Sequence, residues 1–196
     1  MVKKITSFKM IQMYTSDYGA RYYLREMADR LGKPHQTIRP YADMLAEEGI
    51  LKESQRKNLT EFTLNLKDKR AYDYLVIAEK ESLLERLRKD TYLKVLFEKL
   101  SPSFERATFV IFGSAADKIK EGSDIDLLVI GACSITRIIE DFESVYNKKI
   151  HKIQAASLSK LSLTFIKEVY KKHLILNNTE QVVRFFGELY EQNKLV

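Results

Sequence analysis

The stretch Phe109-Val110-Ile111-Phe112-Gly113-Ser114 is followed, after nine residues, by Asp124-Ile125-Asp126-Leu127-Leu128-Val129-Ile130. An apolar run ends in Gly-Ser, and a second apolar run opens with two carboxylates two residues apart. Short apolar runs of this kind are typical of buried strands. Because side chains two apart on a strand point to the same face, Asp124 and Asp126 are predicted to project together.

Four positions in this stretch suit a nucleotide and its metal ions: Gly113, Ser114, Asp124 and Asp126. Carboxylate oxygens are ligands that Mg²⁺ prefers, and nucleotide phosphates can complete its coordination. Gly113 permits a sharp turn and a close approach of the backbone to a phosphate. Ser114 offers a hydroxyl where a helix is expected to begin, and helix-start amides favour an anion. We therefore predict Asp124 and Asp126 as catalytic and metal-binding residues, and Gly113 and Ser114 as nucleotide-binding residues.

Taken singly the two motifs are weak, because Gly-Ser is a common turn and Asp-x-Asp can simply begin an exposed strand. Their combination resembles the nucleotidyltransferase superfamily of DNA polymerase beta, and specifically its minimal nucleotidyltransferases. The resemblance spans about residues 92–157, and its most specific part is Ser123-Asp124-Ile125-Asp126-Leu127-Leu128-Val129. It implies binding of an NTP, with ATP the leading candidate, at a two-metal Mg²⁺ site. It also implies transfer of a nucleoside monophosphate to a hydroxyl acceptor.

The resemblance further implies a kind of acceptor. Family members pair as antitoxins with toxin partners and adenylylate them, so a protein partner of toxin type is expected. Small molecules and RNA ends are the other acceptors in the family.

The sequence departs from the family pattern at the third acidic position. That carboxylate usually stands on the next strand, here expected at about 149–156, and by alignment Gln154 occupies its place. Gln cannot serve as a general base and is a poorer metal ligand than a carboxylate. His151 is close by, but an offset of three residues is expected to put it on the other face. Family members also often carry a basic residue shortly after Gly-Ser and a second Gly, a pattern that residues 115–118 do not preserve well. Transfer and nucleotide binding without transfer therefore both stay open.

The first 66 residues show a different pattern, of three helices followed by a hairpin. One helix has apolar residues at helical spacing and ends at Gly32, a second is expected at about 35–48, and two strands flank a polar tip at 55–58. This order resembles a winged helix-turn-helix domain over about residues 5–66. In that family the third helix enters the DNA major groove and the hairpin touches phosphates.

The resemblance to a winged helix implies a set of DNA-binding residues. They are His35, Gln36, Thr37 and Arg39 on the helix, with Arg56 and Lys57 on the hairpin. Gln can pair with adenine, and Arg with guanine or phosphate. Polar residues are also the default at any exposed helix start, so a structural or protein-binding role stays open. Pro40 is expected to kink this helix or to mark the start of its regular part.

The chain is thus predicted to be an α+β protein with an N-terminal winged helix-turn-helix and a C-terminal nucleotidyltransferase fold. The expected parts are a winged helix-turn-helix domain at 1–66, a helical connector at 67–90 and a nucleotidyltransferase-like domain at 91–196. The last part reads as a small mixed sheet with strands near 107–112, 125–131 and 149–156 and helices near 134–147, 159–172 and 179–193.

Composition adds weaker constraints. The formal net charge is +6, and residues 1–66 hold 11 Lys and Arg against 8 Asp and Glu. This excess points mildly to a polyanionic partner such as DNA, although a solvated Lys-rich surface explains it equally. Cys133 is the only cysteine, which excludes an internal disulfide. Without an apolar run long enough for a membrane or a signal-peptide pattern, a cytoplasmic protein without membrane contact is expected.

A second function class competes with the transferase. In it, the protein is a transcriptional regulator whose degenerate nucleotidyltransferase domain serves nucleotide sensing or dimerisation. The Phe185-Phe186 pair fits either a core position or a homodimer surface. His173 is expected on the surface or in packing, and Cys133 in a structural role.

Overall fold

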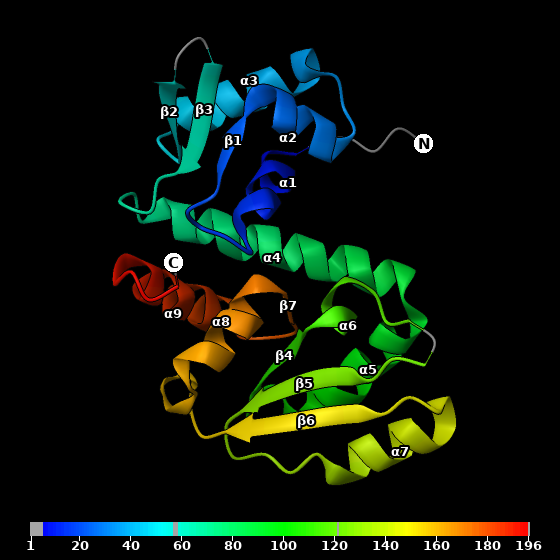
Figure 1. Cartoon of the computed structure of the whole chain (residues 1–196). Helices are drawn as coiled ribbons and strands as arrows, with labels where there is room; N and C mark the ends of the chain where they lie inside the picture. The colour runs from blue at the N-terminus through cyan, green and yellow to red at the C-terminus, as the bar shows by residue number, and fades with distance from the viewer. Residues whose placement is uncertain (1–5, 57–58, 121, 196) are drawn as a thin grey trace.

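The computed structural model describes residues 6–56, 59–120 and 122–195. Within these residues, two parts lie on either side of one long helix, α4 (Arg70–Lys89), as Figure 1 shows. The N-terminal part contains a three-stranded sheet in the order β1-β3-β2, and the C-terminal part a four-stranded sheet in the order β6-β5-β4-β7. The fold class is α+β, as predicted.

The N-terminal part begins with short helices and ends in the expected hairpin. Its elements are α1 (Ser7–Ile11), η1 (Gln12–Tyr14), β1 (Arg21–Tyr23), α2 (Leu24–Leu31), α3 (His35–Glu47), β2 (Leu51–Arg56) and β3 (Leu59–Leu64). Helix α2 ends at Gly32, whose φ of +60° is left-handed and suits a residue without Cβ. Helix α3 follows Pro34 and runs through Pro40, so its regular part does not start there. Strand β1 was not predicted, because three residues are too few to show alternation.

A compact core holds these elements together. Ile38, Ala42 and Leu45 of α3 are fully buried, and their spacing places them on one face of the helix. Tyr14 crosses this core, and its hydroxyl donates a hydrogen bond to the carbonyl of Phe62, 3.1 Å away. The bond satisfies a buried polar group and ties η1 to β3.

Helix α4 belongs to both parts of the molecule. It packs against α1 on one side and against α9 (Thr179–Glu191) and strand β7 (His173–Ile175) on the other. One buried cluster therefore runs from the N-terminal core through α4 to one face of the C-terminal sheet. The residues predicted as a connector form a shared structural element.

The C-terminal sheet is mixed, as predicted. Strand β4 (Thr108–Phe112) pairs antiparallel with β5 (Ile125–Ile130) and with β7, while β5 pairs parallel with β6 (Ile150–Ala155). One face packs on α5 (Thr91–Leu100) and α7 (Thr136–Tyr146). The other face packs on α4, α8 (Leu163–Lys171) and α9. The sheet thus lies between two layers of helices (Figure 1).

Several details of this part differ from the prediction. The helix expected at 159–172 begins only at Leu163, after the 3₁₀ turn η3 (Leu158–Lys160), because Ser162 caps it by accepting from the amide of Phe165. A further 3₁₀ turn, η2 (Ser101–Ser103), precedes β4, and the helix after Gly-Ser, α6 (Ser114–Asp117), has one turn. Phe186 is 1% exposed and belongs to the core.

Among the helices of the described residues, none is both long enough and apolar enough to cross a bilayer.

Candidate functional site

The Gly113 turn stands directly against the Asp126 carboxylate. Gly113 has φ +66° and ψ −146°, a conformation that side-chain-bearing residues rarely adopt. A Cβ added there would lie 2.9 Å from Oδ2 of Asp126. The Gly113 amide is held by the carbonyl of Lys172 at 3.1 Å. Only glycine allows the backbone to pass this close to the carboxylate.

Asp126 has an unpredicted neighbour in His151. The parallel register of β5 and β6 places these two residues side by side, so they share one face of the sheet. Nδ1 of His151 lies 3.3 Å from Oδ1 of Asp126, and the two side chains are 68% and 32% exposed. The prediction that His151 lies away from the carboxylate site was wrong, because it depended on the position of Gln154.

Gln154 does not occupy the place expected of a third acidic residue. Its register partner is Val129, which faces the side of the sheet opposite to Asp126. Its amide donates hydrogen bonds to the carbonyls of Gly131 (3.0 Å) and Cys133 (3.1 Å). Gln154 therefore holds the segment after β5 in place. Its assignment to the third acidic position of the site was wrong. On the Asp126 face, β6 contributes His151, Ile153 and Ala155, none of which is a carboxylate.

Asp124 and Ser114 complete the predicted set at more open positions. Asp124 is exposed immediately before β5, and Ser114 is exposed at the first position of α6. In the described part of the chain, no group of three or more His, Cys, Asp and Glu side chains is arranged to hold a metal ion. Two open carboxylates still fit Mg²⁺, which keeps several water or phosphate ligands and is commonly held by one or two carboxylates.

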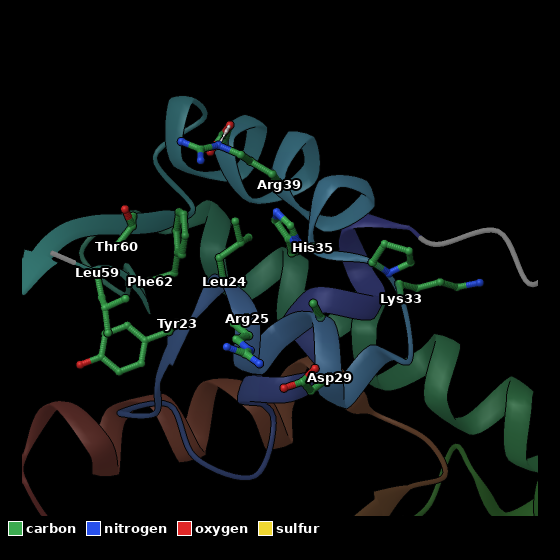
Figure 2. A pocket seen from close by; sticks show the side chains of 13 residues that line it. Tyr23, Leu24, Arg25, Asp29, Lys33, His35, Arg39, Leu59, Thr60 and Phe62 are labelled. Carbon is green, nitrogen blue, oxygen red and sulfur yellow. Dashed lines mark ion pairs between the residues drawn. The ribbon is translucent and has the colours of Figure 1, made fainter.

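A second candidate site lies in the N-terminal part. A cavity of about 620 Å³ opens between α2, α3 and β3. Figure 2 shows His35 and Arg39 of α3 around the same hollow as Arg25 and Asp29 of α2. The i, i+4 spacing of His35 and Arg39 brings them to one side of α3. Gln36 and Thr37 are exposed on α3 but do not line this cavity.

The cavity between α2, α3 and β3, called the groove from here on, contains basic residues that the sequence did not reveal. Arg25 and Lys33 join Arg39, while Asp29 and Asp43 reduce the positive charge. Arg25 is the second residue of α2 and Lys33 lies in the turn before α3, so only the packing of the two helices brings them together. Their proximity in sequence to the predicted helix start was the one available signal.

Arg39 and Arg56 are already engaged in ion pairs. Arg39 lies 3.4 Å from Asp43, one turn later on α3, and remains 63% exposed. Arg56 of β2 lies 3.9 Å from Glu61, which is also contacted by Arg21 at 3.2 Å. The Arg39–Asp43 pair is exposed and worth at most about 1 kcal/mol, so Arg39 can exchange its partner for a phosphate. The side chain of Glu61 is buried, and it would keep Arg21 as a partner if Arg56 turned to a phosphate. Lys57 lies outside the described residues.

A buried ion pair lies behind the Gly113 turn. His173 of β7 lies opposite Phe112 in the pairing of β7 with β4. Nε2 of His173 lies 2.9 Å from Oε1 of Glu79 on α4. Its Nδ1 faces the carbonyls of Val169 and Tyr170. Burial alone lowers the pKa of His173, but Glu79 and the two carbonyls outweigh it, so the pKa is raised. Acceptors at both ring nitrogens favour the protonated imidazole. The side chain of His173 is thus buried beside a carboxylate and does not lie on the surface.

Comparisons with known proteins give weak likenesses. No protein-family model matches the chain, and no curated protein matches it. A toxin–antitoxin structure with AMP-PNP is 18% identical, with a TM-score of 0.38, over 52% of this chain and 88% of that chain. A mutant of the toxin–antitoxin MntA-HpeT is 17% identical, with a TM-score of 0.36, over 50% and 84%. HmgR of Pseudomonas aeruginosa is 15% identical, with a TM-score of 0.27, over 80% and 53%. Likenesses of this strength decide neither fold nor function.

The structure by itself gives a fold class and two candidate sites. The chain is an α+β protein in which a glycine turn meets a strand carboxylate at the end of a mixed sheet. A separate groove with several basic residues lies in its N-terminal part.

Proposed function

We propose that the chain binds an NTP, with ATP the leading candidate, together with Mg²⁺ at the Gly113 turn. The observation that carries this proposal is the 2.9 Å separation between a Cβ built on Gly113 and the Asp126 carboxylate. A phosphate that approaches the Gly113 turn and is held by the amide and hydroxyl of Ser114 would lie beside that carboxylate. Asp124 and Asp126 would hold the metal, which would screen phosphate charge and help pyrophosphate leave.

The proposed reaction is nucleotidyl transfer to a hydroxyl. The acceptor oxygen forms a bond to the α-phosphorus, the bond from that phosphorus to the bridging oxygen breaks, and pyrophosphate leaves with the electron pair. The acceptor proton is released to water. The proposed acceptor is a side chain of a protein partner of toxin type, following the resemblance of the Gly-Ser and Asp-x-Asp motifs.

The N-terminal part is proposed to be a winged helix-turn-helix that binds DNA. Its order of helices and hairpin supports this proposal, as does the position of His35 and Arg39 in a groove with Arg25 and Lys33. Cations in such a groove would contact phosphates, and α3 would supply the side chains that reach bases.

Transfer is tested with ATP labelled at its α-phosphate. The wild-type protein and its toxin-type partner are expected to give a labelled product only with Mg²⁺. In the Asp124→Ala/Asp126→Ala variant, transfer should fall at least about a hundredfold, because the phosphate charge is no longer screened. Asp141→Ala removes an exposed carboxylate of α7 and serves as the matched control. Equal labelling in wild type and double variant would refute the assigned site.

One observation favours a second function. On the Asp126 face, β6 supplies His151, Ile153 and Ala155 and no carboxylate. This arrangement supports a regulator that senses the nucleotide without transferring it. Restoring an acid at Gln154 would not help, since that side chain faces the other side of the sheet. The regulator is distinguished by Mg²⁺-dependent ATP binding that changes DNA affinity while no label is transferred.

A further inference from the structure

A cavity lies where the N-terminal part meets the C-terminal sheet. Its volume is about 320 Å³, near the lower end of the range for small-ligand sites. Its lining comes from four places: the turn after η1, the C-terminal half of α4, the short helix α6, and the junction of α8 with β7. The lining residues are Thr15, Ser16, Ser82, Arg86, Ala116, Asp117, Lys171, Lys172 and His173. None of Gly113, Ser114, Asp124 and Asp126 lines it.

The chemistry of this lining is that of an anion site. Besides His173, the lining has three cations (Arg86, Lys171 and Lys172), three hydroxyls and one carboxylate, Asp117. That carboxylate is bound by Lys172, whose Nζ lies 2.7 Å from Oδ2 of Asp117. Lys171 has no ion pair with any of the described residues, so its charge is not balanced locally. Lysine, arginine and hydroxyl groups together are the usual partners of phosphate oxygens.

Arg86 is already fixed in position. Its side chain is 16% exposed, its Nη2 donates to the carbonyl of Ala115 at 3.2 Å, and it lies 3.5 Å from Asp90. The Asp90 carboxylate also accepts hydrogen bonds from two backbone amides, those of Leu93 and Ile119. A cation that is held before the ligand arrives loses little conformational freedom on binding.

The rear of the cavity is also rigid and charged. The His173 ring is held between Glu79 and the two carbonyls at the end of α8. The carbonyl of Lys172 accepts a hydrogen bond from the Gly113 amide. Ser82 and Arg86 are one turn apart on α4 and therefore face the cavity together. The N-terminal part adds the hydroxyls of Thr15 and Ser16 across the opening.

We propose that this junction cavity binds a phosphate group, with Arg86 and Lys171 as its principal cations. The ligand class is a phosphate-bearing anion, either free or as the tail of a nucleotide. Because the lining comes from both parts of the chain, a bound phosphate bridges the N-terminal part to α6 and β7. The site is independent of Mg²⁺ and of the proposed transfer reaction.

The proposal is tested with inorganic pyrophosphate in the presence of EDTA, measured by calorimetry. Wild type is expected to bind saturably, with an affinity that falls as salt is raised. Lys171→Ala should weaken binding about tenfold, the loss typical of one charge-assisted hydrogen bond. Arg86→Lys keeps the charge but removes the planar guanidinium and should also weaken binding. Lys160→Ala, an exposed lysine of η3 outside the cavity, should bind like wild type.

Thermal unfolding without ligand checks that each variant is folded, and Lys171 is exposed, so its replacement should be tolerated. Asp126→Ala should bind pyrophosphate normally, which separates this site from the proposed nucleotide site. Displacement of pyrophosphate by ATP identifies the ligand as a nucleotide tail, and failure to displace identifies a free phosphate anion; both results support the cavity. Absence of saturable binding, or equal binding in wild type and Lys171→Ala, overturns the proposal.

Discussion

At the scale of single residues, Gly113 carries two constraints at once. Its backbone is in a region that favours glycine, and the space for a Cβ is taken by Asp126. Gly113→Ala is therefore expected to lower the free energy of unfolding by about 1–3 kcal/mol and to displace the carboxylate. ATP binding should be lost together with stability. Gly32→Ala, at φ +60° with no atom within 4 Å of the added Cβ, should strain the backbone but leave ATP binding intact. Urea unfolding of both variants measures the loss of stability, and ATP calorimetry measures whether only Gly113→Ala loses ATP binding.

The buried His173–Glu79 pair gives a pH prediction at the same scale. The pKa of His173 is raised in the folded protein, so its contribution is fully present below the unfolded value of about 6.5 and is lost as pH rises through the folded pKa. Wild-type stability should accordingly fall as pH is raised above 6.5. His173→Gln should remove this part of the dependence and destabilise the protein by about 3–5 kcal/mol, because Glu79 is left buried without its partner.

Urea titrations across this pH range measure the effect directly. His151→Gln, which alters an exposed pair, serves as the control and should keep the wild-type dependence. The same pH dependence in His173→Gln as in wild type would show that the pair is not ionised as described.

At the scale of elements, the packing of α2 against α3 creates the proposed DNA groove. Arg39→Ala and Arg25→Ala should each weaken DNA binding and reduce the slope of log affinity against log salt by about 1, as expected for one phosphate contact. Arg137→Ala removes an exposed arginine of α7 and should change neither quantity. Fluorescence anisotropy with duplex DNA at several salt concentrations gives both numbers. Unchanged affinity and slope in the two groove variants would move the DNA contact elsewhere.

The elements also show what could be predicted from the sequence. Strands β4 and β5 were evident because each is an apolar run with a polar signal at its end. The register of β6 was not evident, because parallel pairing is a long-range property and a shift of one residue exchanges the faces. Gln154 was therefore assigned to the site in place of His151. Strand β7 has only three residues, and its role in burying His173 against Glu79 depends on α4, almost a hundred residues earlier.

At the scale of the whole molecule, α4 joins the two parts into one packed unit. Tyr18 of the N-terminal part packs edge-on against Tyr170 of α8, and its amide donates to the Tyr170 hydroxyl at 2.5 Å. The Gln12 side chain donates to the carbonyl of Ala78 at 3.1 Å. These contacts join the N-terminal part to α4 and to α8 of the C-terminal part.

The central claim is that Gly113, Ser114, Asp124 and Asp126 form one nucleotide site. Calorimetry of ATP binding with and without Mg²⁺ tests it most directly, in wild type, Asp124→Ala/Asp126→Ala and the Asp141→Ala control. We predict Mg²⁺-dependent ATP binding in wild type and in the control, and a loss of at least about tenfold in the double variant, because two metal-holding carboxylates are gone. Wild-type binding no tighter than that of the double variant would contradict the claim.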